Sequence, residues 1–258
     1  MGWQDSLVYR WNALVWVLYA VLPSVTMMCV WIAAYGAHRS TAIGGFSLSR
    51  MMTYYLCVTT LSVIITPHPE WEISQQIRNG LITQFMVKPI DFFTYRAVQE
   101  TAYQIVKSIM LIPSLIIMVL LFHQYIVLPT LSPSHFSAFL IAVAIAYVLL
   151  CQLKFLMGIS AFWIAEPGGF MEIWNVLTGV FAGRLLPLAL LPGWMLAIGT
   201  ALPFSSLYAF PMRLLLGAPT SQEIALGFAR QTLWLAALSI LVRLAWRNGL
   251  RAYEAYGG

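Results

Sequence analysis

The sequence predicts an all-α integral membrane protein with six transmembrane helices, and two properties of the chain lead to this fold class. Of the 258 residues, 60% are hydrophobic and only 9% are charged, whereas soluble domains carry about a quarter charged residues. Several apolar runs also reach the roughly 20 residues with which an α-helix crosses a bilayer. A membrane β-barrel would show alternating segments of about 10 residues instead. A single transmembrane domain over residues 1–258 accounts for the whole chain.

The six spanning helices are expected at apolar runs that polar residues interrupt. These runs are residues 11–35, 49–66, 101–122, 136–164, 171–190 and 223–246. Before them, residues 1–10 place Trp3 and Leu7 opposite Asp5 and Arg10, which is the pattern of a helix that lies in the membrane interface. We expect this segment to form an N-terminal interfacial elbow helix.

The orientation follows from the lysines and arginines of the short loops, because these residues gather on the cytoplasmic side of membrane proteins. With a cytoplasmic N-terminus, most of them lie inside or at the inner boundary: Arg10, Arg78, Lys88, Arg96, Lys107, Arg243, Arg247 and Arg251. A smaller group lies at the outer boundary: Arg39, Arg50, Arg213 and Arg230. Both termini are therefore expected in the cytoplasm, and residues 67–100 form the main cytoplasmic loop.

Residues 187–219 are apolar but contain too many prolines and glycines for a straight spanning helix. The breaks are Pro187, Pro192, Gly193, Gly199, Pro203, Pro211, Gly217 and Pro219. Non-helical backbone at membrane depth persists only where protein or a water-filled cavity satisfies its polar groups. We therefore expect two short helices that re-enter the membrane from the extracellular side, between the fifth and sixth spans.

The cytoplasmic loop contains a predicted short helix followed by a glycine. Acidic residues occupy its first turn, a base its last turn and the glycine its C-terminal cap, namely Glu70, Glu72, Arg78 and Gly80. Ile73, Ile77 and Leu81 share one face of this segment. A helix held in the cytosol with one apolar stripe favours docking on a partner surface. The alternative is a solvated loop that only joins two spanning helices.

Arg184 is a charged residue inside the predicted fifth span. Ionisable groups at such depth normally face a bundle interior or a cavity, which predicts a place on a translocation pathway. Equally open is a structural role, in which Arg184 reaches the outer headgroups or re-entrant backbone carbonyls. Pro187 and Pro203 of the neighbouring re-entrant region are grouped with it as the predicted pathway or its support.

Two further features inside the spans have weaker interpretations. Lys154 lies late in the fourth predicted span, close to the inner headgroups, where we favour a structural role. Gly179 and Gly183 have the GxxxG spacing that lets two helices approach closely. This spacing predicts a contact with another subunit.

No catalytic, metal or nucleic-acid site is predicted. The cysteines Cys29, Cys57 and Cys151 lie in apolar runs without ligand spacing. A membrane-embedded transferase or hydrolase would need paired polar groups at membrane depth, and none is visible. The net charge of +5 comes from scattered basic residues, which does not indicate nucleic-acid binding. A channel or ion-coupled carrier is a further alternative, although carriers usually bring inverted repeats and paired midplane charges.

The cytoplasmic motif resembles a known family. Its pattern is Glu72, Ile77, Arg78, Gly80 and Leu81, followed by the pair Lys88 and Pro89. It is similar to the segment between the second and third spans of ABC-2-type permeases, the membrane subunits of type V ABC exporters. The stretches "GRLLPLALLPGW" and "LPFSSLYAFP" resemble the re-entrant region of one subfamily, formerly catalogued as a domain of unknown function. The resemblance covers essentially the whole chain.

The resemblance implies the subunit composition of an exporter. The cytoplasmic helix would be a coupling helix, whose residues Glu72, Ile73, Ile77, Arg78, Gly80 and Leu81 seat in a groove of the ATPase. A second identical or related permease subunit would complete the pathway in the cell inner membrane, among membrane lipids. None of the three lysines follows a glycine, as a Walker A loop requires, so ATP and Mg²⁺ would be held by separate ATPase subunits and no cofactor by this chain.

The cargo is inferred from the scarcity of charge. Because few ionisable residues lie inside the predicted spans, we expect an amphipathic, lipid-linked or otherwise hydrophobic cargo. The chain itself is expected to be a non-catalytic subunit.

Overall fold

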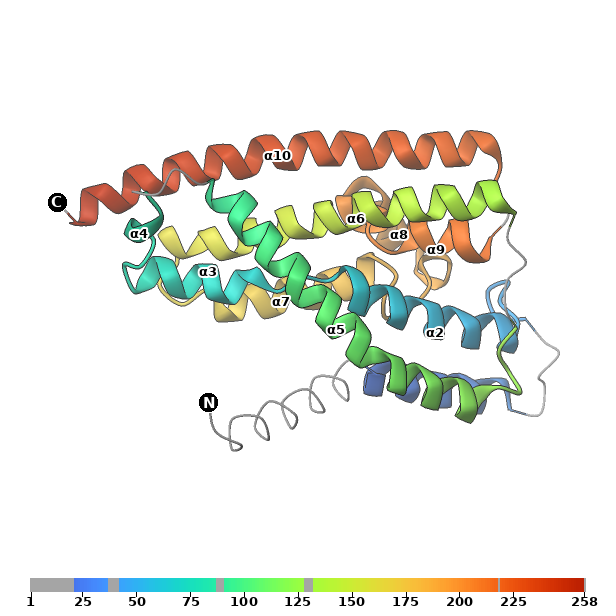
Figure 1. The fold of residues 1–258 in the computed structure, drawn as a ribbon. Coiled ribbons are helices and arrows are strands. Elements are labelled where there is room, and N and C mark those ends of the chain that lie inside the picture. Colours follow the sequence, from blue (N-terminus) through green and yellow to red (C-terminus); the bar gives the residue numbers. More distant parts are fainter. Residues whose placement is uncertain (1–20, 37–41, 87–90, 128–131, 218, 258) are drawn as a thin grey trace, which may run out of the picture. The chain divides into compact units, whose positions relative to one another are not determined.

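The computed structural model describes residues 21–36, 42–86, 91–127, 132–217 and 219–257, and within these ranges it is built of helices and turns (Figure 1). The chain divides into two compact units. One comprises Met1–Ile64 with Ile105–Ser132, and the other Ile65–Gln104 with Pro133–Gly258. The predicted all-α fold is confirmed, while the predicted elbow at residues 1–10 lies outside the described residues.

The first unit holds the helix Val21–Tyr35, most of α2 (Leu48–Ile65) and the C-terminal part of α5 (Phe92–Phe122). Polar side chains join its helices. Trp31 donates its indole N–H to Tyr55 Oη at 3.0 Å, and the Thr53 hydroxyl contacts the backbone of Val127. These bonds satisfy polar atoms that would be costly to leave unpaired in an apolar surrounding.

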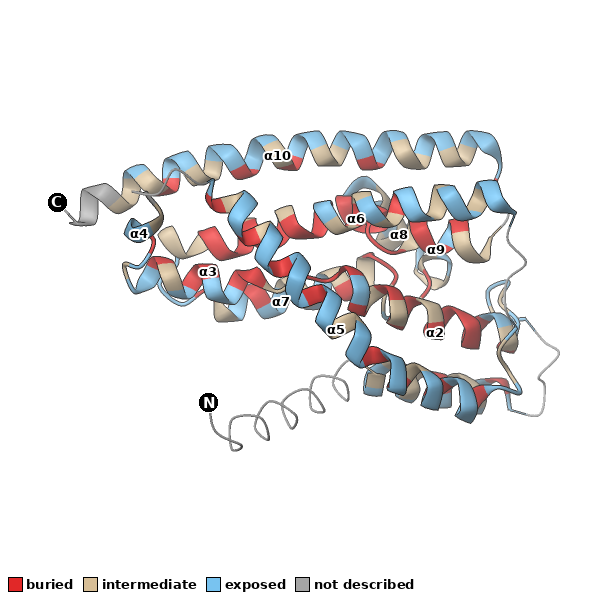
Figure 2. Cartoon of the chain, viewed as in Figure 1, coloured by how far each residue is buried: buried red, intermediate tan, exposed pale blue. Residues whose placement is uncertain are grey.

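The second unit holds the remaining elements. In chain order they are α3 (Pro69–Arg78), α4 (Thr83–Met86), the start of α5, α6 (Pro133–Ile159), η1 (Ser160–Phe162), α7 (Gly168–Phe181), η2 (Leu188–Leu190), α8 (Gly193–Ala201), η3 (Pro203–Ser206), α9 (Ala209–Leu216) and α10 (Ser221–Gly257). The long helices α6 and α10 lie side by side, and α3 packs along the C-terminal half of α6 (Figure 1). The buried residues of this unit gather along these contacts (Figure 2).

Four helical stretches of the described residues are long and apolar enough to cross a membrane. They are Leu48–Arg78, Phe92–Phe122, Pro133–Phe162 and Ser221–Tyr253. The pair Gly193–Ala201 and Pro203–Leu216, bent by 74°, raises the number to five if it counts as one span. The described part of the predicted first span, Val21–Tyr35, is a shorter apolar helix. The described residues therefore support a multi-pass membrane protein, and the number of six spans is not confirmed.

The predicted fifth span, residues 171–190, is wrong as a single helix. α7 ends at Phe181 because Gly183 adopts a positive φ of 86°, a conformation that ends a helix and that glycine tolerates without strain. The backbone N–H of Leu185 then donates to the Gly179 carbonyl at 2.9 Å. Both glycines are buried, and Leu185 covers Gly179 at 3.3 Å from where a Cβ would stand. Both glycines thus take part in a turn within the chain, and their predicted contact with another subunit stays a prediction.

The region that the prolines and glycines mark is broken into short helices, as predicted. Between α8 and α9 the chain bends at residues 203–208, which are all buried. We call these six residues the re-entrant tip. Phe204 of the tip lies between Trp174 and Phe181 of α7, with ring centroids 5.5 and 6.1 Å apart. Entry of this segment from the extracellular side stays a prediction.

Candidate functional site around helix α3

The sequence of α3 fixes its two ends locally. Pro69 stands in the first turn with Glu70 and Glu72, and Arg78 is in the last turn, so the charges oppose the helix dipole at both ends. Gly80 follows with φ of 74°, and Leu81 donates its backbone N–H to the Gln76 carbonyl at 2.9 Å. This closing turn satisfies carbonyls that the helix leaves free. The predicted short helix with its glycine cap is confirmed.

One face of α3 is buried against the chain itself, which corrects an expectation from the sequence. Ile73 is 0% exposed and Ile77 is 3% exposed. Both belong to an apolar cluster with Cys151, Phe155 and Ile159 of α6. Of the predicted stripe, only Leu81 is exposed. Ile73 and Ile77 of the apolar stripe thus anchor α3 to α6. Each Å² of apolar surface that they bury there stabilises the contact by about 25 cal/mol.

Close approach of the two helices depends on a glycine of α6. A Cβ at Gly158 would stand 2.8 Å from Ile73 Cβ and 3.2 Å from Glu70 Cα, closer than carbon atoms pack. Glycine therefore lets α3 lie directly on the backbone of α6.

The opposite side of α3 is exposed and polar, apart from one aromatic ring. Trp71 is 47% exposed, and Gln75 and Arg78 lie on the same side. Arg78 Nη1 donates to Glu166 Oε1 at 3.3 Å and lies 3.5 Å from the Ala165 carbonyl. We call Trp71, Gln75, Arg78 and Glu166 the outer face, because they lie on the side of α3 that points away from α6. It joins α3 to the turn before α7 in one continuous surface.

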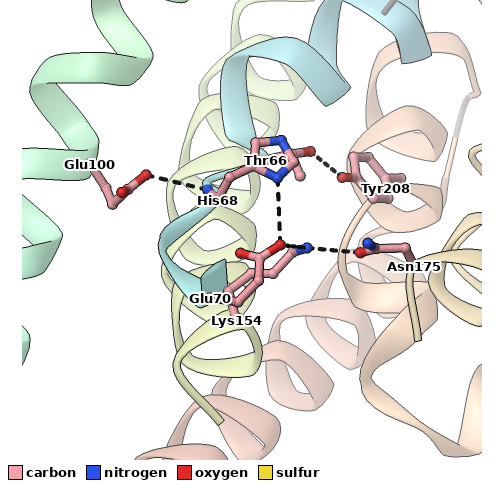
Figure 3. A network of polar contacts seen from close by, with 7 residues as sticks. All are labelled: Thr66, His68, Glu70, Glu100, Lys154, Asn175 and Tyr208. Carbon is pink, nitrogen blue, oxygen red and sulfur yellow. Dashed lines mark hydrogen bonds and ion pairs between the residues drawn. The ribbon is translucent and has the colours of Figure 1, made fainter. Parts of the chain in front are cut away.

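A buried ion pair holds the first turn of α3 (Figure 3). Lys154 of α6 donates from Nζ to Glu70 Oε1 at 2.6 Å and to Asn175 Oδ1 of α7 at 2.8 Å. Glu70 is 0% exposed and Lys154 4%. The expectation that Lys154 lies cheaply among the inner headgroups is therefore wrong: its ammonium is enclosed by α3, α6 and α7.

Further polar contacts surround this pair. His68 Nδ1 lies 3.6 Å from Glu70 Oε1, and the His68 backbone N–H donates to Glu100 Oε2 of α5 at 3.3 Å. On the other side of the turn, buried Arg96 of α5 donates to Glu72 Oε1 at 2.8 Å. The beginning of α3 is thus fixed by α5 and α6 through charged groups, which compensate one another in a region of low dielectric.

Neutral hydrogen bonds hold the re-entrant tip. Tyr208 Oη and Thr66 Oγ1 lie 2.6 Å apart, which ties the tip to the segment that leads into α3 (Figure 3). Gln231 of α10 donates from Nε2 to the carbonyls of Ser206 at 2.9 Å and Ala142 at 3.0 Å. The amide thereby supplies a donor to the backbone of the tip and ties it to α6, of which Ala142 is part.

The remaining predicted site residues have separate places. Arg184 lies in the turn after α7, half-buried, with its Nη2 3.4 Å from where a Cβ of Gly179 would stand. Pro187 precedes η2 and Pro203 begins η3, and both are buried. Of the family motif, Lys88 and Pro89 lie outside the described residues. The structure therefore does not gather Arg184 with the charged residues around α3.

The ion pair is the part of the site that the sequence analysis missed. Glu70 and Lys154 are 84 positions apart, so no spacing rule connects them. The available signal was chemical, because an ionisable residue in an apolar run normally has a partner. In the described ranges, no group of three or more His, Cys, Asp or Glu side chains is placed to hold a metal ion.

Comparison with known proteins identifies the family. A family model described as "ABC-2 family transporter protein" matches residues 21–257. No curated protein and no solved structure matches the chain. With its membrane-spanning helices, the match supports a permease role in ABC transport, and such a role implies association with ABC ATPase subunits. The chain belongs to the ABC-2 family of transporter proteins.

Proposed function

We propose that the chain is the permease subunit of an ATP-driven exporter in the cell inner membrane. Two six-helix subunits, identical or related, form the pathway, and separate ATPase subunits hold ATP and Mg²⁺. Family membership supports the permease role and the ATPase association. Export, the subunit pairing and the docking of the ATPase on α3 are parts of the proposal.

The cytoplasmic position of α3 is inferred from α10. The exposed side of α10 is apolar at Leu233, Ile240 and Leu244 and becomes basic at the exposed residues Arg247 and Arg251. Such a change is typical of a helix that leaves the inner leaflet. Near this basic end, the Tyr253 hydroxyl lies 3.4 Å from where a Cβ of Gly80 would stand. The end of α3 therefore lies on the side that the arginines mark as cytoplasmic.

The division of α3 into two faces is the observation that carries the proposal. Ile73 and Ile77 fix the helix to α6, which leaves the outer face free to meet a partner. Trp and Arg are the residue types that dominate binding energy at protein interfaces, and the outer face contains Trp71 and Arg78. The docking role inferred for Glu72, Arg78 and Leu81 thus rests on exposed groups, while Gly80 is half-buried between them. Ile73 and Ile77 act as anchors.

The cargo proposal follows from the surface of the helices. Large apolar side chains are exposed on α7 and α8, including Ile173, Val176 and Trp194, and few charges lie among them. Surfaces of this kind suit lipid tails or an amphipathic or lipid-linked cargo better than a small ion.

The test is the amount of ATPase that accompanies the tagged chain from native membranes. ATP-binding subunits are quantified by photolabelling with 8-azido-ATP, relative to inserted permease. The double variant Trp71→Ala/Arg78→Glu should bind the ATPase about 30-fold more weakly or worse, and less ATPase should accompany it. This is the loss expected when an interface hot spot worth about 2 kcal/mol is removed. Arg251→Glu makes the same charge change off the outer face and should retain it. Equal recovery with both variants, or none with the wild type, would contradict the proposal.

A further inference from the structure

Lys154 of α6 bonds to two other helices through its side chain. It joins Glu70 of α3 to Asn175 of α7 from its own position on α6, at 2.6 and 2.8 Å. A buried ion pair is a poor source of stability, because desolvation of the two charges offsets their attraction. Its value therefore lies in the geometry that it fixes, since the three helices can move independently only if one of these bonds breaks.

α7 packs directly on the re-entrant tip. Trp174, the residue before Asn175, packs on Phe204 of the tip, and Phe181 at the end of α7 packs on the same ring. A Cβ at Gly199 of α8 would stand 3.0 Å from the Phe181 carbonyl oxygen, so α8 also lies directly on the end of α7. A displacement of α7 at Asn175 must repack these contacts, because close-packed interiors do not deform continuously.

We propose that Asn175 is a positioning residue that links the α3–α6 pair to α7, so that movement of α3 on ATP binding reaches the re-entrant tip through Glu70, Lys154 and Asn175. This inference rests on the proposed function. Asn175 is the point at which the link can be cut alone, because its replacement leaves the Glu70–Lys154 bond in place. The Thr66–Tyr208 bond forms a second, parallel connection, so cutting at Asn175 weakens the response without abolishing it.

Amide hydrogen exchange of the intact permease–ATPase complex measures the link. The response is the change in exchange of residues 193–216 between ADP and ATP with vanadate. In Asn175→Leu, the leucine has a volume similar to that of asparagine but no atom that can accept a hydrogen bond from Lys154. The change in exchange should therefore fall at least about threefold, which is within the range of coupling losses for residues on such networks. Asn175→Asp keeps an acceptor for Lys154 and should retain the wild-type change. Glu172→Gln alters an exposed residue of α7 and serves as the matched control.

A charge exchange tests the same link independently. Lys154→Glu alone places a carboxylate against Glu70 and should lose the response. The double variant Glu70→Lys/Lys154→Glu restores opposite charges, and the Asn175 amide can turn to donate to the new carboxylate, so it should recover at least half of the response.

The outcomes separate this inference from the proposed function. A wild-type nucleotide response in Asn175→Leu overturns the link, and so does equal behaviour of the single and double exchange variants. Raised exchange of Pro69–Arg78 under ADP in Asn175→Leu would mean that α3 itself has loosened, and the charge exchange then decides. Failure of wild-type permease to retain an ATPase overturns the proposed function instead.

Discussion

Glu70 in the first turn of α3 and the residues of the re-entrant tip are all buried, but they are held by different chemistry. Glu70 of α3 is paired with the ammonium of Lys154, whereas the tip is held by the neutral side chains of Gln231 and Tyr208. The comparison shows that an ion pair holds one of these two places and that neutral hydrogen bonds hold the other.

The position of each place along the long helices explains the difference. Phe162 packs on Gly249 near the basic end of α10, where a Cβ would stand 2.3 Å from its ring. Counted from that contact, Lys154 lies roughly 12 Å along α6 and Gln231 about 27 Å along α10. With the basic end of α10 on the cytoplasmic side, as proposed above, Gln231 lies deeper in the membrane than Lys154. At the greater depth a neutral amide supplies hydrogen bonds without the desolvation of an ion.

Breaking the ion pair should have the largest effect on stability. Lys154→Met leaves Glu70 buried without its cation and should lower the free energy of unfolding by about 3–5 kcal/mol, measured by denaturant titration in detergent micelles. Glu70→Leu/Lys154→Met removes both charges and should regain most of that loss. A double variant as unstable as the single one would mean that unpaired charge is not the cause.

Removing the amide at the tip should cost less. Gln231→Leu leaves the Ser206 carbonyl without this donor and should lower the free energy of unfolding by about 1–3 kcal/mol in the same titration. Gln222→Leu, at an exposed position on the same helix, should stay within about 0.5 kcal/mol of the wild type. A loss as large as that of Lys154→Met would remove the distinction between the two regions.

The smallest effect is expected for a single hydroxyl. Tyr208→Phe removes the bond to Thr66 and should cost about 0.5–1.5 kcal/mol. Tyr103→Phe alters an exposed tyrosine of α5 and gives the baseline for the same change of side chain. If the two variants unfold at the same denaturant concentration, the Thr66–Tyr208 bond does not hold the tip.

The sequence predicts those parts of the molecule that depend on local rules. The ends of α3 follow from Pro69, Arg78 and Gly80, and the broken region follows from its prolines and glycines, because each signal lies within a few residues of its effect. The end of α7 is not predicted by these rules, because the GxxxG spacing of Gly179 and Gly183 fits a continuous helix equally well. It is the positive φ of Gly183 that ends α7.

The contacts between distant segments could not be predicted in the same way. Helical periodicity groups Ile73 and Ile77 on one side of α3, and both are buried together. Leu81 lies beyond the end of the helix and is exposed. Periodicity does not say whether the side with the isoleucines meets a partner or the chain's own α6. The decision comes from Phe155, Gly158 and other residues about 80 positions later. The same separation concealed the partner of Lys154.

Cross-linking from the two faces of α3 tests most directly whether its outer face meets the ATPase. Gln75→Cys and Ile77→Cys are compared in a background in which Cys29, Cys57 and Cys151 are replaced by alanine, using a short bismaleimide on the native complex. Gln75 is exposed and Ile77 is buried, so a cross-link to the ATPase is expected from position 75 and not from position 77. Cross-linking from position 77 without any from position 75 would contradict the assignment of the faces.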